Sequence, residues 1–129
     1  MSDTIFYVDQ SKIRAGKFEP LQEAMNELVQ FIDINEPQLI AYNVYFNKDR
    51  SRMTVIHVHA DATSLQFHMD VAGRMFPRFS QFIQLQAIDV FGNPNEHLVR
   101  QLRQKAEMLG NGTVHIHNLH DGFDRFPMV

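Results

Sequence analysis

Histidines and one aspartate are the side chains of this sequence best suited to acid–base chemistry. His57 and His59 form a His-x-His pair, His68 follows them, and Asp9 precedes them. Imidazole titrates near neutral pH and therefore suits proton abstraction. We expect His59 and His68 to be candidate catalytic bases, with Asp9 as the carboxylate that orients one of them. The alternative is that His68 only lines a helix–sheet interface, where a backbone carbonyl satisfies it.

Hydroxyl, amide and aromatic side chains accompany these residues and form a candidate substrate site. They offer hydrogen bonds to a substrate oxygen and an apolar surface for its rings. The expected substrate-binding residues are Tyr7, Tyr42, Asn43, Tyr45, His57, Phe76 and Phe79. The chain also has 11 Phe and 7 Met, which suggest a soft interior able to repack around a small aromatic or apolar ligand.

A second His-x-His pair lies at His115 and His117. Alternate residues of a strand share one face, so each pair has the geometry to chelate a metal ion through two imidazoles. If the two pairs met, His57, His59, His115 and His117 would suit Zn, Ni or Cu. No spacing matches a recognised metal signature and no cysteine completes one. We therefore expect no cofactor and keep a His-rich metal site as an alternative.

The composition is that of one globular domain. The 129 residues are 44% apolar, and 12 basic against 15 acidic side chains give a net charge of −3. This mild acidity lacks the basic footprint of a nucleic-acid or anionic-membrane binder. No stretch approaches the roughly 20 apolar residues of a membrane span, and no signal peptide is visible. We expect a cytoplasmic protein with no nucleic-acid or membrane partner.

Hydrophobic periodicity predicts the secondary structure. The predicted strands are Thr4 to Ile13, Leu39 to Phe46, Met53 to Ala60, Phe82 to Phe91 and Thr113 to Leu119, and the predicted helices run from Phe18 to Asn35, from Asp61 or Thr63 to Phe79, and from Asn93 or Asn95 to Gly110. Gly73 and Pro77 predict a kink in the second helix. Lys105 lies outside the apolar stripe of the third helix and is expected on its exterior.

The first six elements are ordered strand–helix–strand–strand–helix–strand. This order predicts an α+β class, ferredoxin-like fold with an antiparallel sheet and both helices on one face. We expect Tyr7, Val55, His57 and His59 on the other, open face, and the strand from Leu39 to Phe46 to be covered on both faces. Such an open face is too apolar for water, so a sheet-to-sheet homodimer would cover it and enclose a cavity.

Several local motifs within this order carry a family resemblance. They are the Gly16-Lys17 turn, Glu36-Pro37 after the first helix, Val44-Tyr45 in the second strand, His68 on the second helix and the aromatic segment Phe76 to Phe82. With these motifs, residues 5–83 resemble the antibiotic biosynthesis monooxygenase-like (ABM) domains of the dimeric α+β barrel superfamily. The resemblance implies an ABM-like ferredoxin-like domain over residues 1–91 and a homodimer. We expect residues 92–129 to be a C-terminal helix–strand extension of the same domain.

The sequence departs from the family at places that matter for function. Gln38 follows Glu36-Pro37 where the family commonly has Gly. His59 stands where many members carry an acid and an indole late in the third strand. Members that degrade heme have a heme-ligating His at the position of Arg78 and an Asn near that of Asp9. These replacements argue against heme degradation.

The resemblance implies a cofactor-independent oxygenase, or a related enzyme, that acts on a small aromatic or quinoid molecule in a dimer-enclosed cavity. In this interpretation the base generates an electron-rich anion that meets dioxygen in a dry pocket. One alternative is a non-catalytic, ligand-binding or stress-associated dimer. Another is a His-rich metal-binding protein. Because fold does not fix activity, the sequence leaves open whether the chain is an enzyme or, more narrowly, a monooxygenase.

Overall fold

A computed structural model of the chain describes residues 3–126. The strands are β1 (Ile5–Ile13), β2 (Ala41–Phe46), β3 (Arg52–His59), β4 (Ile83–Phe91) and β5 (Thr113–His117), and the helices are α1 (Phe18–Asn35), α2 (Ala62–Ala72), the 3-10 helix η1 (Gly73–Gln81) and α3 (Glu96–Gly110). The predicted elements are therefore all present, with ends that differ by a few residues.

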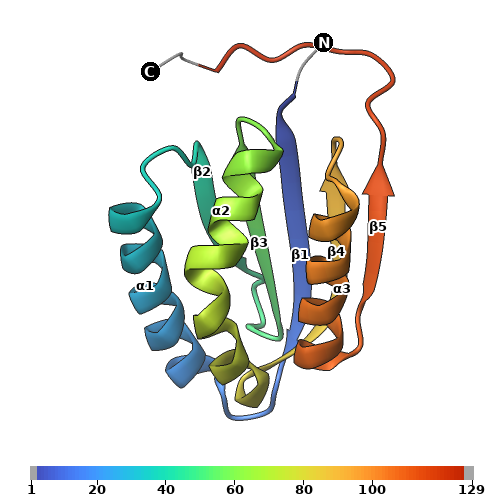
Figure 1. Ribbon diagram of the computed structural model, residues 1–129. Helices are drawn as coiled ribbons and strands as arrows, with labels where there is room; N and C mark the ends of the chain where they lie inside the picture. Colours follow the sequence, from blue (N-terminus) through green and yellow to red (C-terminus); the bar gives the residue numbers. More distant parts are fainter. Residues whose placement is uncertain (1–2, 127–129) are drawn as a thin grey trace.

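The five strands form one sheet in the order β2-β3-β1-β4-β5. The first four are antiparallel to their neighbours, whereas β5 pairs in parallel with β4. The helices form a single layer over one face of this sheet, and α3 crosses that same face between β4 and β5 (Figure 1). The first six elements are thus a ferredoxin-like α+β unit, to which α3 and β5 add a further crossover.

The helix-facing side of the sheet holds the core. Along β1, Ile5, Tyr7, Asp9 and Ser11 are buried while the residues between them are partly or fully exposed. The same alternation on β3 buries Val55, His57 and His59. A strand directs alternate side chains to opposite faces, so this two-residue period brings the polar side chains of Asp9, Ser11, His57 and His59 under the helices.

This placement corrects one prediction about the sheet. Tyr7, Val55, His57 and His59 were expected on the open face, but each is at most 2% exposed and packs beneath the helices. The alternation was predicted correctly, and only the choice of face was wrong. A two-residue period divides a strand into two sets but does not say which set the helices cover.

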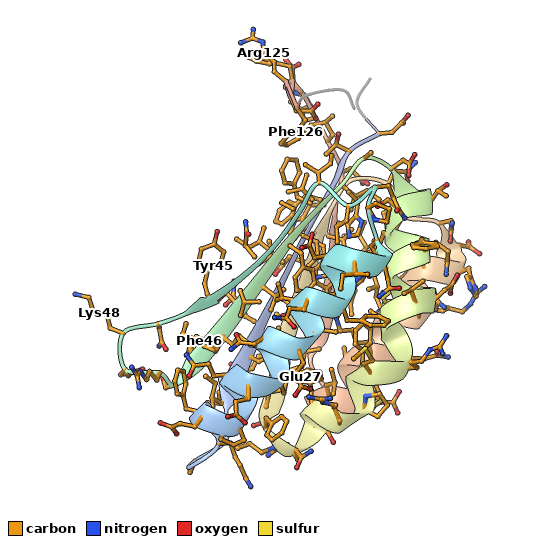
Figure 2. All side chains as sticks on the ribbon, turned by 90° about the vertical axis from the view of Figure 1, so that its left-hand side faces the viewer. Glu27, Tyr45, Phe46, Lys48, Arg125 and Phe126 are labelled. Atoms are coloured by element: carbon orange, nitrogen blue, oxygen red, sulfur yellow. The ribbon has the colours of Figure 1, made fainter. Side chains whose placement is uncertain are left out.

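Strand β2 is also different from the expectation. It lies at the edge of the sheet rather than in a doubly covered interior, and Tyr45 is 51% exposed. In Figure 2 the Tyr45 side chain projects from the side of the sheet opposite the helices. The apolar residues on one face of this strand pack toward the helices. Those on the other face belong to the open side of the sheet, which no second layer of the described chain covers.

Local signals explain how the second helical segment is built. Asp61 caps α2, because its side chain accepts a hydrogen bond from the Ser64 backbone N–H at 2.9 Å. The chain then changes to the tighter η1 at Gly73, and Pro77 lies inside η1. Pro has no N–H for an α-helical bond, so the predicted kink takes the form of a change of helix type.

The extension after β4 begins and ends with asparagines. The Asn95 side chain accepts from the Leu98 N–H at 2.9 Å, and Asn111 ends α3 with a left-handed backbone conformation. A Cβ on Gly112 would lie 2.8 Å from the Leu85 carbonyl oxygen, so Gly lets the chain pass close to β4. These signals turn α3 back onto the sheet and let β5 pair with β4.

Candidate functional site

A buried polar cluster lies between the sheet and the helices. We use this name for the buried side chains of Tyr7, Asp9, Glu36, His57, His59, Ser64, His68 and Lys105, together with the partly buried Tyr42. Its members come from β1, the end of α1, β2, β3, α2 and α3, so every layer of the fold contributes. Burying so many polar groups costs free energy unless they bind one another, and most of them do.

The first part of the cluster is built on β1 and α3. Tyr7 donates to Asp9 Oδ2 at 2.8 Å, Lys105 Nζ donates to the Tyr7 hydroxyl oxygen at 2.6 Å, and Lys105 Nζ lies 3.5 Å from Asp9 Oδ2. Burial raises the pKa of Tyr7 well above its usual value, and Asp9 adds to this rise. Burial also lowers the pKa of Lys105, although Asp9 opposes the shift.

The Lys105 ammonium group also lies over two aromatic rings. Its Nζ is 4.4 Å from the centre of the Phe76 ring and 4.9 Å from that of Tyr7. A ring face attracts a cation, so these contacts help to offset the loss of water around the charge. The result is a cation fixed inside the protein by one carboxylate, one hydroxyl and two rings.

The second part is the pair of His68 and Glu36. His68 Nδ1 lies 3.0 Å from Oε1 and 2.9 Å from Oε2 of Glu36. A carboxylate only accepts hydrogen bonds, so Nδ1 carries the ring proton of neutral His68 and Nε2 has a free electron pair. Burial lowers the pKa of His68, and Glu36 opposes this shift. Within residues 3–126, His68 Nε2 has no hydrogen-bond partner.

The third part is a row of hydrogen bonds along β3 and into α2. His57 Nδ1 lies 3.3 Å from His59 Nε2, and His59 Nδ1 lies 2.8 Å from Ser64 Oγ. Burial lowers the pKa of His57 well below its usual value and that of His59 to about 3. Both rings are therefore neutral at physiological pH.

Ring contacts join these three parts. The His57 ring centre is 4.2 Å from that of Tyr7, 4.4 Å from that of Tyr42 and 4.6 Å from that of His68. Burial raises the pKa of Tyr42 well above its usual value, with smaller contributions from Asp9 and Glu36. The tyrosines thus remain protonated and can donate hydrogen bonds.

A small cavity adjoins the cluster. Its volume is about 30 Å³, and its lining includes Asp9, Tyr42 and Lys105 on the polar side and Met25, Phe76 and Phe79 on the apolar side. A volume of this size holds water or another molecule of two or three atoms. An aromatic ring enters only if the lining side chains move.

The structure brings together most of the residues that the sequence singled out. Tyr7, Asp9, Tyr42, His57, His59 and His68 belong to the cluster, and Phe76 and Phe79 line the cavity. Asn43 and Tyr45 do not join them, because they lie exposed on β2. The partner of His68 is a side-chain carboxylate rather than the backbone carbonyl of the alternative interpretation.

Three members of the cluster were not predicted as site residues. Glu36 was noted only as part of a family motif, and Ser64 gave no signal by its spacing. Lys105 was expected on the exterior of α3 but is 7% exposed, so that expectation was wrong. Its position beside the buried Ala106 and three residues after Leu102 was the available signal, because such a position lies at the edge of an apolar stripe.

The metal alternative finds no support in the placement of the histidines. His57 and His59 are buried under the helices, whereas His115 and His117 are exposed on the edge strand β5. His117 Nε2 lies 2.8 Å from Asp89 Oδ1, and His115 Nε2 lies 3.0 Å from Thr113 Oγ1. Across residues 3–126, no group of three or more metal-binding side chains is close enough to hold an ion.

Comparison with known proteins gives structural matches. No family model and no curated protein matches the sequence. MupZ from Pseudomonas fluorescens is 17% identical with a TM-score of 0.75, and the match covers 97% of this chain and 91% of that one. Its span therefore includes the extension formed by α3 and β5. None of the helices in the described part of the chain is long and apolar enough to cross a membrane.

Two further matches cover less of the chain. SnoaB, a cofactor-independent oxygenase from Streptomyces nogalater, is 11% identical with a TM-score of 0.61, covering 73% of this chain and 96% of its own. A candidate antibiotic biosynthesis monooxygenase from Caulobacter crescentus CB15 is 16% identical with a TM-score of 0.63, covering 73% and 92%. Identities this low establish shared architecture and nothing more, and on that basis the chain has the ferredoxin-like fold of the ABM-like proteins.

Proposed function

We propose that this chain is a cofactor-independent enzyme that removes a proton from a small phenolic or quinol-type molecule and lets the resulting anion react with dioxygen. The observation that carries the proposal is the buried pair of Glu36 and His68, whose Nδ1 contacts the carboxylate while Nε2 has no partner in the described structure. A carboxylate that holds an imidazole in one tautomer is a common arrangement of general bases.

The charges of the cluster offset part of the cost that burial places on proton uptake by His68. Counting Asp9 and Glu36 as carboxylates and Lys105 as an ammonium group gives −2 + 1 = −1 when the histidines are neutral. A proton accepted at His68 Nε2 brings this total to zero. In a buried site a neutral total is favoured, because unbalanced charge is poorly solvated there.

Lys105 and Tyr7 are placed to stabilise the negative charge of the substrate anion. The Lys105 ammonium lies on the cavity wall and Tyr7 is hydrogen-bonded to it. A fixed cation stabilises negative charge that develops on a substrate oxygen, and it does so more strongly inside a protein than in water. For a substrate with a CH₂ group beside a phenol ring, one oxygen atom of dioxygen becomes the new carbonyl and the other leaves as water, so no outside reductant is needed.

The cavity limits how such a substrate enters. At about 30 Å³ it has room for dioxygen but not for a ring. Met25, Met53, Phe76 and Phe79 form much of its apolar wall. Methionine side chains adapt their shape easily, so we propose that the ring enters by displacing this wall.

Oxygen consumption tests the proposed reaction. The full chain is mixed with a panel of anthrones, hydroquinones and naphthols, with and without a chelator, and compared with His68→Ala. We expect turnover that the chelator does not change and a fall in kcat/KM of about 100-fold or more in the variant. His120→Ala, at an exposed position, is the control. Full turnover by His68→Ala, or no turnover of any panel member by the unaltered protein, would overturn the proposal.

We also propose that two copies pair through the open face of the sheet. Phe6, Tyr45 and Phe91 are 37%, 51% and 41% exposed on that face, which the described chain leaves largely uncovered (Figure 2). Phe126 lies against this face, with its ring centre 6.0 Å from that of Phe6. A second copy offers a matching apolar surface, and face-to-face sheet packing buries it.

Sedimentation equilibrium tests the pairing. We expect a dimer for the unaltered chain and a shift toward monomer for Tyr45→Arg, because the substitution places a charge in the buried face. Met108→Arg is the matched control, since Met108 is 43% exposed on α3 and lies on the helix side. A monomer at all concentrations, or dissociation by the control alone, would contradict this arrangement.

A further inference from the structure

A row of hydrogen bonds runs from His57 through His59 to Ser64, and the proton abstraction proposed above does not use it. Its three side chains are at most 4% exposed, and it joins the interior of the cluster to the first turn of α2. His57 is at the inner end, where its ring faces that of His68. Ser64 is at the outer end, beside the exposed capping residue Asp61.

The hydrogen bonds restrict where the ring protons can be. A neutral imidazole has one N–H, and a bond between two rings needs one donor and one acceptor. If His59 Nε2 donates to His57 Nδ1, then His57 carries its proton on Nε2 and His59 Nδ1 accepts from the Ser64 hydroxyl. If His57 Nδ1 donates to His59 Nε2, then His57 Nε2 has a free electron pair and His59 Nδ1 donates to Ser64 Oγ.

We propose that Ser64, His59 and His57 form a proton relay that connects the interior of the buried cluster with solvent at the start of α2. When His57 Nε2 takes up a proton, its Nδ1 proton passes to His59 Nε2, and the His59 Nδ1 proton passes to Ser64 Oγ. The original hydroxyl proton of Ser64 then leaves to water. One proton enters and one leaves, so no ring becomes charged in either resting state.

The surroundings of the relay suit this role. His57 Nε2 and His68 Nε2 are the two buried imidazole nitrogens that have no hydrogen-bond partner within residues 3–126, and their ring centres are 4.6 Å apart. The groups that face the relay are Tyr7, Tyr42, His68 and Lys105. Burial lowers the pKa of both relay rings, and the Lys105 charge adds to this effect at His57. Both rings therefore stay neutral, as the transfer requires.

The relay rests on the proposed function in one respect, because its use is to return the proton that His68 takes from the substrate. Protonated His68 has its extra proton on Nε2, next to His57. Passing that proton outward frees His68 Nε2 without opening the site to bulk water, and the row carries the next proton once both relay rings have regained their first tautomer. The residues of the relay are positioning residues in this scheme, since they act through His68.

Nitrogen-15 NMR of the full chain tests the relay without any substrate. Long-range proton–nitrogen correlations report which ring nitrogen carries the proton. We expect His57 and His59 at pH 7 to be neutral and in the same tautomer, both with the proton on Nε2 or both on Nδ1. Opposite tautomers, or a charged ring at this pH, would overturn the relay whether or not the protein is an enzyme.

Kinetics of Ser64 variants supply the second test. Ser64→Ala keeps the backbone N–H that Asp61 caps but removes the hydroxyl. We expect kcat to fall about 10-fold or more, kcat/KM to change little and the solvent isotope effect on kcat to rise. Ser64→Thr should restore kcat, and Thr63→Ala, at an exposed position in the same turn, should leave it unchanged. An unchanged kcat in Ser64→Ala, with turnover lost in His68→Ala, would reject the relay but keep the base.

Discussion

His68 Nδ1 lies within 3.0 Å of both carboxylate oxygens of Glu36, although the two residues are 32 positions apart in the chain and each side chain is only 1% exposed. Glu36 ends α1 and His68 lies in the middle of α2, so the contact depends on how the two helices pack on the sheet. The contact fixes the tautomer of His68 and leaves Nε2 as the atom that accepts a proton.

Replacing Glu36 by Gln should move the pH dependence of turnover. The carboxylate raises the pKa of His68 against the opposing effect of burial, so its removal lowers that pKa further. The acid limb of kcat/KM should shift to lower pH, and the maximal rate should fall because the base is weaker. A pH–rate profile measures both effects. A limb that stays in place would show that His68 is not the titrating base.

The pairing of Lys105 with Asp9 should contribute measurably to the free energy of unfolding. Lys105→Met leaves the buried Asp9 carboxylate without its cation, and we expect a loss of about 3–5 kcal/mol in the free energy of unfolding. Asp9→Asn in the same chain should recover much of this loss, because the unpaired charge is gone. Urea unfolding measures the cycle, with exposed Lys48→Met as the control. A double variant no more stable than Lys105→Met would refute the coupling.

The neutral imidazoles should make stability fall in acid. Below the ordinary histidine pKa of about 6.5, the unfolded chain takes up protons that folded His57 and His59 refuse. The free energy of unfolding should thus decrease as the pH falls from about 6.5 toward the His59 pKa of about 3, by up to about 1.4 kcal/mol per pH unit for each ring.

His59→Gln isolates the contribution of one ring. The slope of unfolding free energy against pH is set by the number of protons taken up on unfolding, and in this variant that number should fall by up to about one. The carboxylates contribute equally to the slope in both proteins. His115→Gln, on exposed β5, provides the comparison. Equal slopes in the unaltered protein and in His59→Gln would mean that His59 is protonated in the folded state.

Enlarging the cavity should allow an aromatic probe to bind. Phe79 is 3% exposed and lines the cavity, so Phe79→Ala should cost about 3–5 kcal/mol of stability and leave space for a small ring. Titration with indole in a calorimeter measures whether a ring binds in the new space. Phe123→Ala, at a side chain 76% exposed, should change stability by less than about 0.5 kcal/mol. No indole binding to Phe79→Ala would indicate that the wall collapses instead.

Most of the fold was predictable because it follows from local patterns. The two-residue period on β1 and β3, the helical stripe of α1 and the break in the second helical segment, which begins at Gly73, each depend on neighbours in sequence, and each is confirmed. The face of the sheet that carries the helices was not predicted correctly, because it depends on packing between distant elements. The exposed Tyr45 on β2 shows the same limit for an edge strand.

The site was predictable by residue type but not by partner. Histidines and tyrosines stand out by their chemistry, so His57, His59 and His68 were found. Glu36, the residue that follows α1, looks like the glutamates of that helix in the sequence, and only the packing of α2 against α1 shows that it is buried at 2% exposure. Lys105 looks like a surface lysine in the sequence. Only the folded structure, in which β5 pairs beside β4, shows that the Lys105 side chain on α3 lines the cavity. Partners that meet through tertiary packing leave little trace in one sequence.

The position of Lys105 on α3 has a consequence for how reactivity is acquired in this architecture. The βαββαβ unit supplies the imidazoles, the tyrosines and both carboxylates, but the cation arrives on a helix appended behind the last strand of that unit. A helix that follows the last strand of this unit can therefore set the charge of the unit's interior, and shortening or exchanging that helix would change the interior polarity without altering the order of the βαββαβ elements.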